Sequence, residues 1–593
     1  MRMNARSRVL AACGLLAVCF TGFSWRLVHV QVREHEHYTQ EAVKKHSDRI
    51  TVPARRGSIT DARGELLAQN EPINTVIADG SLIKDPAGLV EVLAGPLEIE
   101  PATLRTMLAR KAENGTAPHC YIVLKKRVPE TVTNELERQF AARRLRGIRF
   151  APEASRIYPN FRLACHVIGF ASDDSTGVGG VEQSFNTLLA GTAGSRIIAR
   201  DGKGRELPQY RGYERPPCNG HNLRLTIDIG LQNIVETELE EACKRYRPKG
   251  ATIILMEPRT GAVLALANRP NFNLNDLARG TEEQRRNRAI TDLYEPGSTF
   301  KVVTAAAALD RGIVSPTATI FCENGYYQAY RLRDHAPYRY LTVNDILVHS
   351  SNIGVAKLAI MVGEKTFYDY VRRFGFGDTT GISLPAEERG QVHPPHTWDK
   401  LTETRMAMGH AVSVTPLQVA TAMSAIANGG KLMLPQILKE VTDENGVVTA
   451  GYPPQEVRPV CRQSVARAVR DAMIEVCTPK GTAALARVFG YKVAGKTGTA
   501  QKPDGHGGYL RDQYIVSFAG FMPAMDPAFV AVVVFDEPRT KAGQYYGGLV
   551  AAPVFARIAE KAASYLGLPV TETRMQGDKG GVFAREGRDL SAP

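Results

Sequence analysis

The hydrophobic pattern begins with one long apolar segment, from Val9 to Val30, in which Arg26 is the single formally charged residue. Because an arginine near the end of a membrane-spanning helix can extend its guanidinium to the interface, this segment is long enough to cross a bilayer once. Arg2, Arg6 and Arg8 precede it, and basic residues favour the cytoplasmic side. No small-residue cleavage site follows the apolar core, which argues against a cleaved signal peptide. We predict an uncleaved anchor in the cytoplasmic membrane, with the rest of the chain on the outer side.

Short extended and helical patterns alternate after the anchor and suggest no chemistry. The polar stretch from His35 to Lys45 predicts a juxtamembrane helix. Between Arg55 and Ala68, two short extended runs surround an Asp-x-x-Gly turn at Asp61–Gly64, and this pattern predicts a β-hairpin. The Arg-Pro-Pro-Cys-Asn-Gly stretch at 215–220 predicts a linker. A patterned segment without candidate chemistry next to a membrane is most simply a spacer or docking domain.

The rest of the chain predicts strands at both ends of a long helical region. The expected elements are a helix over Ile229–Tyr246, strands over Ala251–Met256 and Ala262–Ala267, mainly helical sequence from Gly297 to about Leu485, strands over Tyr491–Val493, Tyr514–Phe521 and Phe529–Phe535, and a final helix over Ala551–Leu566. Such an order predicts one sheet assembled from distant segments and covered by helices.

A chain of 593 residues is too long for one ordinary core. We expect an α+β protein with several parts. In chain order these are a cytoplasmic tail at 1–8, the anchor at 9–30, a mixed α/β pedestal domain at 31–218, a sheet-and-helix domain at 219–570 and a disordered polar tail at 571–593.

Charge and cysteine content add little to this prediction. The formal net charge of +13 does not indicate nucleic-acid binding, because a domain outside the membrane would not normally meet nucleic acid. Two of the nine cysteines lie in the predicted anchor, and the other seven show neither CxxC pairs nor zinc-ligand spacing. A disulfide remains possible in that compartment, but no pair is indicated. We predict no metal, because His393 and His396 flank a proline-rich loop without a third ligand, and we expect His410 to be structural.

Candidate chemistry comes from three short motifs in a fixed order: Ser-Thr-Phe-Lys at Ser298–Lys301, Ser-Ser-Asn at Ser350–Asn352 and Lys-Thr-Gly-Thr at Lys496–Thr499. A lone Ser-x-x-Lys carries little information, because another occurs at Ser81–Lys84, and Ser184–Asn186 repeats Ser-x-Asn. The central set differs in context. Glu-Pro-Gly precedes the first motif and a long apolar helix-forming run follows it. In contrast, Pro86 follows Lys84 closely, which makes a helix that carries both Ser81 and Lys84 unfavourable.

The first motif suits an active serine. Ser298 and Lys301 are three residues apart, so they share one face of a helix. Pro296 fits a first-turn position and would place Ser298 at the helix N-terminus, where the helix dipole favours negative charge on oxygen. If Lys301 is also removed from water, its pKa falls and its neutral amine can accept the Ser298 proton.

The second and third motifs supply polar groups around that serine. Ser350 brings a hydroxyl able to relay a proton, and Asn352 brings an amide able to hold a substrate peptide group. On the strand predicted for the third motif, Gly498 permits close backbone approach. Lys496, Thr497 and Thr499 suit recognition of a carboxylate. The backbone N–H groups of Ser298 and Thr499 are candidate oxyanion donors.

With these three motifs, the chain resembles a class B penicillin-binding protein, and within that family a division-specific peptidoglycan transpeptidase of the FtsI type. Further stretches carry the resemblance: Arg56–Asp61, Arg156–Pro159, Gly180–Glu182, Leu225–Asp228, Gly409–His410, Val414–Gln418, Tyr545–Gly548 and Pro553–Phe555. One departure is Ala411, which stands where the family pattern has a glycine.

The resemblance implies both fold and activity. It implies a dimerisation-type pedestal and a β-lactamase-like transpeptidase domain, with an antiparallel sheet flanked by helices. Ser298 would attack the D-Ala-D-Ala amide of a stem peptide, and the amine of a neighbouring stem peptide would resolve the acyl-enzyme. Lys301 would act as general base, Ser350 as relay, and Asn352 and the Lys496–Thr499 motif in substrate binding. β-Lactams would acylate Ser298, no cofactor is expected, and a membrane glycosyltransferase and division proteins would be partners.

Several rival functions remain open. An elongation-specific transpeptidase of the same class shares all three motifs, so only the flanking stretches favour the septal assignment. A D,D-carboxypeptidase or β-lactamase would use water as acceptor, and the anchor and pedestal argue against both. A β-lactam sensor would be expected to carry further membrane spans and a cytoplasmic output domain. A division scaffold without turnover is disfavoured by the intact motif set.

Overall fold

The computed structural model describes residues 5–38, 47–109, 121–172, 174–199, 214–504, 508–540 and 543–572. Predictions made for residues 1–4, for the juxtamembrane helix beyond residue 38, for Cys120 and for the tail from 573 to 593 lie outside the described residues. Two compact units divide the chain. The first comprises Met1–Arg55 with Ala190–Gly220, and the second comprises Arg56–Leu189 with His221–Pro593.

The first unit contains the apolar helix and a small sheet. Helix α1 (Ala5–Val28) continues into a π-helical turn, η1 (His29–Arg33). Among the described residues, one helix, Arg8–Arg33, is long and apolar enough to cross a membrane, and none of its apolar window is buried. The predicted anchor at 9–30 falls within it. The sheet has the order β1-β8-β9 (Ser47–Val52, Gly194–Ala199 and Glu214–Arg215), with antiparallel pairing.

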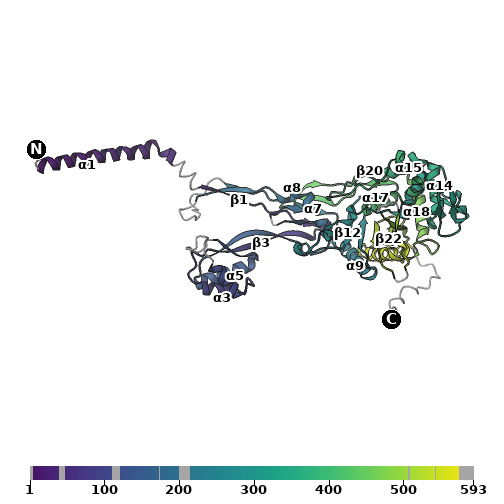
Figure 1. Cartoon of the computed structure of the whole chain (residues 1–593), viewed down its shortest axis with the longest axis horizontal. Coiled ribbons are helices and arrows are strands. Elements are labelled where there is room, and N and C mark those ends of the chain that lie inside the picture. The colour runs from purple at the N-terminus through teal and green to yellow at the C-terminus, as the bar shows by residue number, and fades with distance from the viewer. Residues whose placement is uncertain are drawn as a thin grey trace. The chain divides into compact units, whose positions relative to one another are not determined.

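The second unit begins with the pedestal. The predicted hairpin is confirmed, because β2 (Ile59–Thr60) pairs antiparallel with β3 (Leu66–Ala78). Strand β3 also pairs with β4 (Ile122–Pro129) and β5 (Ile148–Ile157). Helices α3 and α5 lie beside the far end of β3 (Figure 1). The remaining pedestal elements are α3 (Pro86–Leu93), α4 (Pro101–Leu108), α5 (Glu130–Arg143), α6 (Cys165–Ile168), β6 (Phe170–Ala171), β7 (Gly177–Val178), α7 (Gly180–Ser184) and α8 (Asn186–Ala190).

The pedestal sheet continues into the C-terminal part of the same unit. Strand β2 pairs in parallel with β10 (Asn222–Leu225), which pairs with β18 (Leu438–Thr442), which in turn pairs with β19 (Val448–Gly451). The hairpin tip also contacts the start of α9 (Ile229–Tyr246), whose N-cap is Asp228. Fully buried Asp61 accepts the Ile229 N–H at 3.0 Å, together with the N–H groups of Arg63 and Glu65 at 2.8 Å each.

The second sheet confirms the prediction of strands gathered from distant segments. Its antiparallel order is β12 (Val263–Arg269), β11 (Gly250–Met256), β23 (Phe529–Asp536), β22 (Tyr509–Met522) and β21 (Ala494–Pro503). The strand predicted at Tyr491–Val493 is wrong in position, because β21 begins at Ala494. An isolated bridge between Val488 and Tyr491, around Gly490 at φ +81°, makes those residues a turn.

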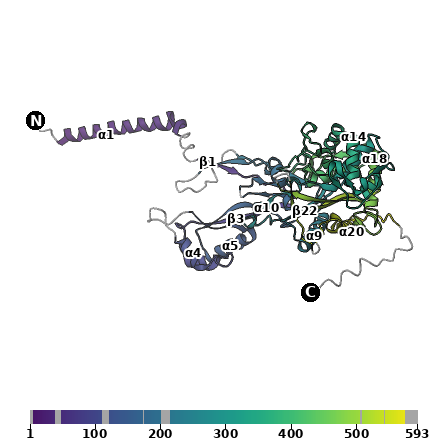
Figure 2. The same ribbon diagram turned by 45° about the vertical axis from the view of Figure 1, so that its right-hand side comes forward.

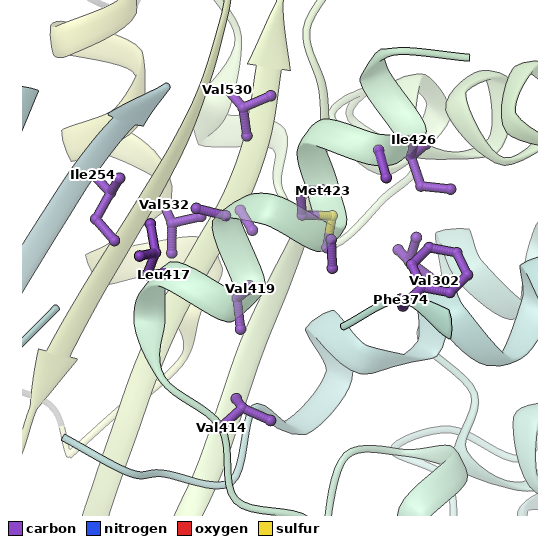
Figure 3. Close-up of a cluster of buried hydrophobic side chains, with 14 of the residues drawn as sticks. Ile254, Val302, Phe374, Val414, Leu417, Val419, Met423, Ile426, Val530 and Val532 are labelled. Carbon is purple, nitrogen blue, oxygen red and sulfur yellow. The ribbon is translucent and has the colours of Figure 1, made fainter. Parts of the chain in front are cut away.

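Strict alternation along the central strands separates two hydrophobic faces. Ile253 and Leu255 of β11 pack in the cluster that contains α9 and α20 (Ala552–Leu566), whereas Ile254 of the same strand packs in the cluster that contains α17 (Pro416–Ala427). Figure 2 shows α9 and α20 on one side of β22 and α14 and α18 on the other. On the α17 face, Leu417, Val419 and Met423 lie near Val530 and Val532 of β23 (Figure 3). A period of two in the strands thus gives the sheet two buried faces.

The helices in the middle of the chain share one hydrophobic cluster with α17. Helix α12 (Lys301–Asp310) contacts α14 (Asn352–Val362), α15 (Glu364–Arg373) and α18 (Gln463–Val476). The other elements of this region are η3 (Leu277–Arg279), α10 (Glu282–Arg285), α11 (Arg288–Thr291), η4 (Gly297–Phe300), β13 (Thr319–Phe321), η5 (Glu323–Gly325), β14 (Tyr326–Tyr327), η6 (Gln328–Tyr330), β15 (Leu332–Arg333), β16 (Tyr340–Thr342), α13 (Val343–Val348), η7 (Pro395–Thr397), α16 (Thr402–Ala407), β17 (Lys431–Met433), β20 (Glu456–Pro459), η8 (Ala484–Ala486) and α19 (Gly547–Val550).

We expect Asp61→Ala to lower the free energy of unfolding by about 3 kcal/mol, because three backbone N–H groups lose a buried charged acceptor. Thermal and urea unfolding of the detergent-solubilised chain would measure the change. Asp526→Ala is the control, since it removes an exposed ion pair with Arg259 that is worth at most about 1 kcal/mol. Equal stabilities of the two variants would contradict the assigned role of Asp61.

Candidate active site

Ser298 lies in a tight turn built by two glycines. The 3₁₀ turn η4 leads directly into α12, and the Lys301 N–H donates to the Ser298 carbonyl. The sequence predicted Pro296 in the first turn of the helix. In the structure Pro296 instead precedes the 3₁₀ turn. Gly297 has φ +55° and donates its N–H to the Gly409 carbonyl at 3.0 Å. A Cβ on Gly409 would lie 2.0 Å from the Gly297 oxygen, so the approach requires glycine.

The Lys301 side chain links the first motif to the second. It is fully buried, and its Nζ donates to the Ser350 carbonyl at 2.5 Å and to Asn352 Oδ1 at 2.7 Å. The Ser350 hydroxyl lies 3.3 Å from the same nitrogen. Ser350 adopts the left-handed conformation, with φ +55°, which turns the chain between α13 and α14.

Lys496 of β21 reaches the same hydroxyl from the other side. Its Nζ lies 2.9 Å from Ser350 Oγ and 3.3 Å from the Thr497 carbonyl, and its side chain is fully buried. The Ser350 hydroxyl therefore lies between two buried lysine nitrogens. The structure thus brings Lys301, Ser350, Asn352 and Lys496 into one hydrogen-bonded network, with Ser298 one helical turn before Lys301.

Burial of two lysines changes their protonation. Removal from water lowers the pKa of Lys301 well below its ordinary value; the neighbouring charge of Lys496 adds to this effect and Asp334 opposes it. Burial likewise lowers the pKa of Lys496 to about 7, with Cys477 acting in the opposite direction. Because two ammonium groups in a dry site repel each other, this repulsion adds to burial in favouring the neutral form of the Lys301 amine.

The third motif lies on a sheet edge that comes close to the serine turn. A Cβ on Gly498 would lie 2.2 Å from Ser517 Oγ and 2.9 Å from the Pro296 carbonyl oxygen. The Thr499 hydroxyl accepts the Gly547 N–H at 3.2 Å, and the Thr497 hydroxyl lies 3.1 Å from that of Thr482. Since β21 ends the sheet order, every second backbone N–H of this strand points away from β22.

Two groups around the site carry no local sequence signal. Glu295 Oε2 lies 2.7 Å from His410 Nδ1, and Glu295 Oε1 accepts the Ala411 N–H at 2.9 Å. Ala411 has φ +55°, which agrees with the glycine of the family pattern at this position. The second group is Asp334, which contacts the start of α14. Asp334 and the Glu295–His410 contact were not predicted from the sequence, because both depend on long-range folding.

Metal and disulfide chemistry find no support in the described part of the chain. Within it, no group of three or more His, Cys, Asp or Glu residues is placed to hold a metal ion. The eight described cysteines are free thiols.

Two family models match the chain. The penicillin binding protein transpeptidase domain matches residues 251–560, and the penicillin-binding protein dimerisation domain matches residues 51–225. Together these matches cover the second sheet with its motifs and most of the pedestal.

Relatives and solved structures match over most of the chain. Peptidoglycan D,D-transpeptidase FtsI of Escherichia coli (strain K12) is 33% identical over 558 residues, which are 93% of this chain and 90% of that protein. Stage V sporulation protein D of Bacillus subtilis (strain 168) is 32% identical over 585 residues, 97% of this chain and 88% of the relative. Penicillin Binding Protein 2X from Streptococcus thermophilus superposes with a TM-score of 0.75 at 26% identity, covering 87% of this chain and 80% of that one. The chain therefore belongs to the class B penicillin-binding proteins, the peptidoglycan D,D-transpeptidases that combine a dimerisation domain with a penicillin-binding transpeptidase domain.

Proposed function

We propose that this transpeptidase cross-links peptidoglycan stem peptides at the division septum through an acyl-enzyme on Ser298. The observation that carries the proposal is the buried Lys301 amine, which is hydrogen-bonded to the second motif and lies one turn after the serine. A lysine removed from water and placed beside another lysine suits a general base, because burial and the neighbouring charge both lower its pKa.

In the first half-reaction, Ser298 Oγ attacks the carbonyl carbon of the D-Ala-D-Ala amide and Lys301 accepts the hydroxyl proton. The C–N bond then breaks, Ser350 passes a proton to the leaving amine, and the terminal D-alanine departs. The contacts of the Ser350 hydroxyl with both Lys301 and Lys496 support this relay. The outcome is an ester between Ser298 and the donor peptide.

In the second half-reaction, the amine of a neighbouring stem peptide attacks the ester carbonyl. A new amide forms, the C–O bond breaks, and Ser298 regains its proton through the same lysine. During both steps the backbone N–H groups of Ser298 and Thr499 stabilise the oxyanion, a contribution of about 2.7–4 kcal/mol per donor in related chemistry. Because a β-lactam carries a strained amide and a carboxylate in similar positions, it enters the first half-reaction and acylates Ser298.

The remaining residues of the second and third motifs bind the substrate. Asn352 holds a peptide group of the donor. Lys496, Thr497 and Thr499 bind its carboxylate, and Gly498 lets β21 approach the substrate backbone. The close packing of Gly498 against the Pro296 carbonyl supports this arrangement, since it fixes the distance between the strand and the serine turn.

The septal role and the orientation in the membrane are the finer parts of the proposal. The stretches Tyr545–Gly548 and Pro553–Phe555 resemble septal family members, and the basic residues before α1 favour a cytoplasmic N-terminus. We therefore propose a single-pass anchor with the transpeptidase outside the cytoplasmic membrane. By the same resemblance, a membrane glycosyltransferase and division proteins are its partners. The alternative is an elongation-specific enzyme of the same class.

Incubation with a penicillin tests the active serine. We expect intact-mass analysis of the solubilised chain to show one drug mass added to the wild type and none to Ser298→Ala. Ser81→Ala is the matched control, because it removes the serine of the other Ser-x-x-Lys sequence. It should acylate like the wild type. A folded wild type without an adduct would exclude the catalytic proposal.

The pH dependence of acylation tests the base. We expect the rate to fall as the pH falls through the range in which Lys301 takes up a proton, because the ammonium cannot accept the serine proton. Lys301→Arg keeps a cation at every accessible pH and should acylate about 10² to 10⁴ times more slowly. Lys357→Arg is the control, because Lys357 lies on α14 but pairs with Glu323 instead of facing Ser298. A wild-type rate in Lys301→Arg would remove Lys301 from the mechanism.

Depletion in the native organism separates septal from elongation function. We expect depleted cells to grow without dividing and to form filaments, and a fluorescent fusion to gather at mid-cell. Complementation with Ser298→Ala should fail while Ser81→Ala restores division. Rounded cells that continue to divide would instead assign the enzyme to elongation.

A further inference from the structure

We propose that Asp334 is a positioning residue of this active site, which holds the second motif against Lys301 from a loop that precedes the motif in sequence. The inference rests on the proposed acyl transfer at Ser298. It concerns a side chain that belongs to none of the three motifs.

The Asp334 carboxylate is fully engaged by the first residues around the start of α14. Its Oδ2 accepts the Ser351 hydroxyl at 2.6 Å. Its Oδ1 accepts the backbone N–H of Asn352 at 2.6 Å and that of Ile353 at 3.1 Å. Two of these donors are N–H groups of the first turn of α14, which have no partner within the helix. A negative charge at this end of the helix is also favoured by the helix dipole. The three bonds fix the backbone of Ser351–Ile353 and hence the position of Asn352.

The same loop orients the amide of Asn352. The Arg333 carbonyl accepts Asn352 Nδ2 at 3.0 Å, which leaves Oδ1 directed at Lys301 Nζ, 2.7 Å away. The loop is itself anchored, because the Asp334 N–H donates to the Gly325 carbonyl at 3.1 Å. One dipeptide, Arg333–Asp334, thus sets both the backbone and the side chain of the residue that touches the base.

The carboxylate also acts on the base through its charge. The charged and titratable groups around this part of the site are Lys496 from β21, Asp334, His335 and Tyr338 from the loop, Cys322 beside Ser351, and His349 after α13. The charge of Lys496 lowers the pKa of Lys301, and the charge of Asp334 raises it. Removing the negative charge should therefore keep Lys301 neutral to a lower pH. A carboxylate at a helix N-terminus remote from Lys301 would have no such effect.

A neighbouring cap provides a matched control. Thr342 is the N-cap of α13 in the same segment, and Asp345 completes its capping box: Asp345 Oδ2 accepts the Thr342 hydroxyl at 2.6 Å and the Asp345 N–H donates to that hydroxyl. Asp345 is thus a carboxylate that stabilises a neighbouring helix N-terminus without contacting Lys301 or Asn352 in any described hydrogen bond. Asp345→Asn should therefore lower the melting temperature without moving the pH profile of acylation.

The experiment measures acylation by a fluorescent penicillin, from acid to mildly alkaline pH, together with thermal unfolding of the full solubilised chain. Asp334→Asn keeps the shape of the side chain and an oxygen for the two N–H groups. We expect its acid limb to move to lower pH, with the plateau rate reduced less than about tenfold. Asp334→Ala loses every bond and should acylate about 100-fold more slowly, as expected for a displaced catalytic group.

The outcomes separate this inference from the proposed function. A wild-type rate and profile in both Asp334 variants would overturn the positioning role alone, as would an Asp334→Asn variant that matches Asp345→Asn and changes only the melting temperature. If Asp334→Ala fails to fold, the acid limb of Asp334→Asn decides. A wild type that forms no Ser298-dependent adduct overturns the proposed function and the positioning role with it.

Discussion

The burial of the Lys301 amine is the constraint on which the rest of the structure depends. A lysine nitrogen removed from water must find hydrogen-bond partners, and here Ser350 and Asn352 provide them. A second lysine, Lys496, shares the same hydroxyl. Such a site is stable only if α12, α14 and β21 hold their polar groups within hydrogen-bonding distance, because a half-satisfied buried network is worse than an apolar core. The large hydrophobic clusters on both faces of the sheet supply that rigidity.

Close backbone approach brings the third motif to the other two. Gly297 and Gly409 meet at the serine turn, and Gly498 passes the Pro296 carbonyl. Each contact excludes a Cβ, so these glycines set distances that side chains could not. The position of β21 at the sheet edge completes the arrangement, since one side of this strand pairs with β22 and the other remains available for a substrate backbone.

Local patterns in the sequence predicted those parts of the molecule that local physics determines. Apolar runs located β11, β22 and β23, and the distance between them in sequence indicated a sheet of distant segments. The motifs identified the groups that the structure gathers around Lys301. Long-range contacts left no such signal. Asp334 stands in an irregular stretch with nothing to connect it to α14, and Glu295 shows no local link to His410. The predicted strand lies before the start of β21 because Tyr491 and Val493 alternate with Lys492 as in a strand, whereas Tyr491 closes the turn at Gly490 and β21 begins at Ala494.

The pedestal contributes to this rigidity through a buried ionic cluster and a shared sheet. Glu182 accepts Arg56 and Arg156 at 2.7 Å each, with all three side chains almost fully buried. Breaking a buried pair leaves an uncompensated charge. These three residues come from distant stretches of the chain, and together they fix the position of the first half of β3, where Asn70 contacts Arg56 and Arg156. Because β2 pairs with both β3 and β10, the locked pedestal extends into the sheet that leads to α9. The segment without catalytic groups is thus structurally continuous with the one that carries them, and a displacement of its hairpin would reach α9 through the hydrogen bond between Asp61 and Ile229.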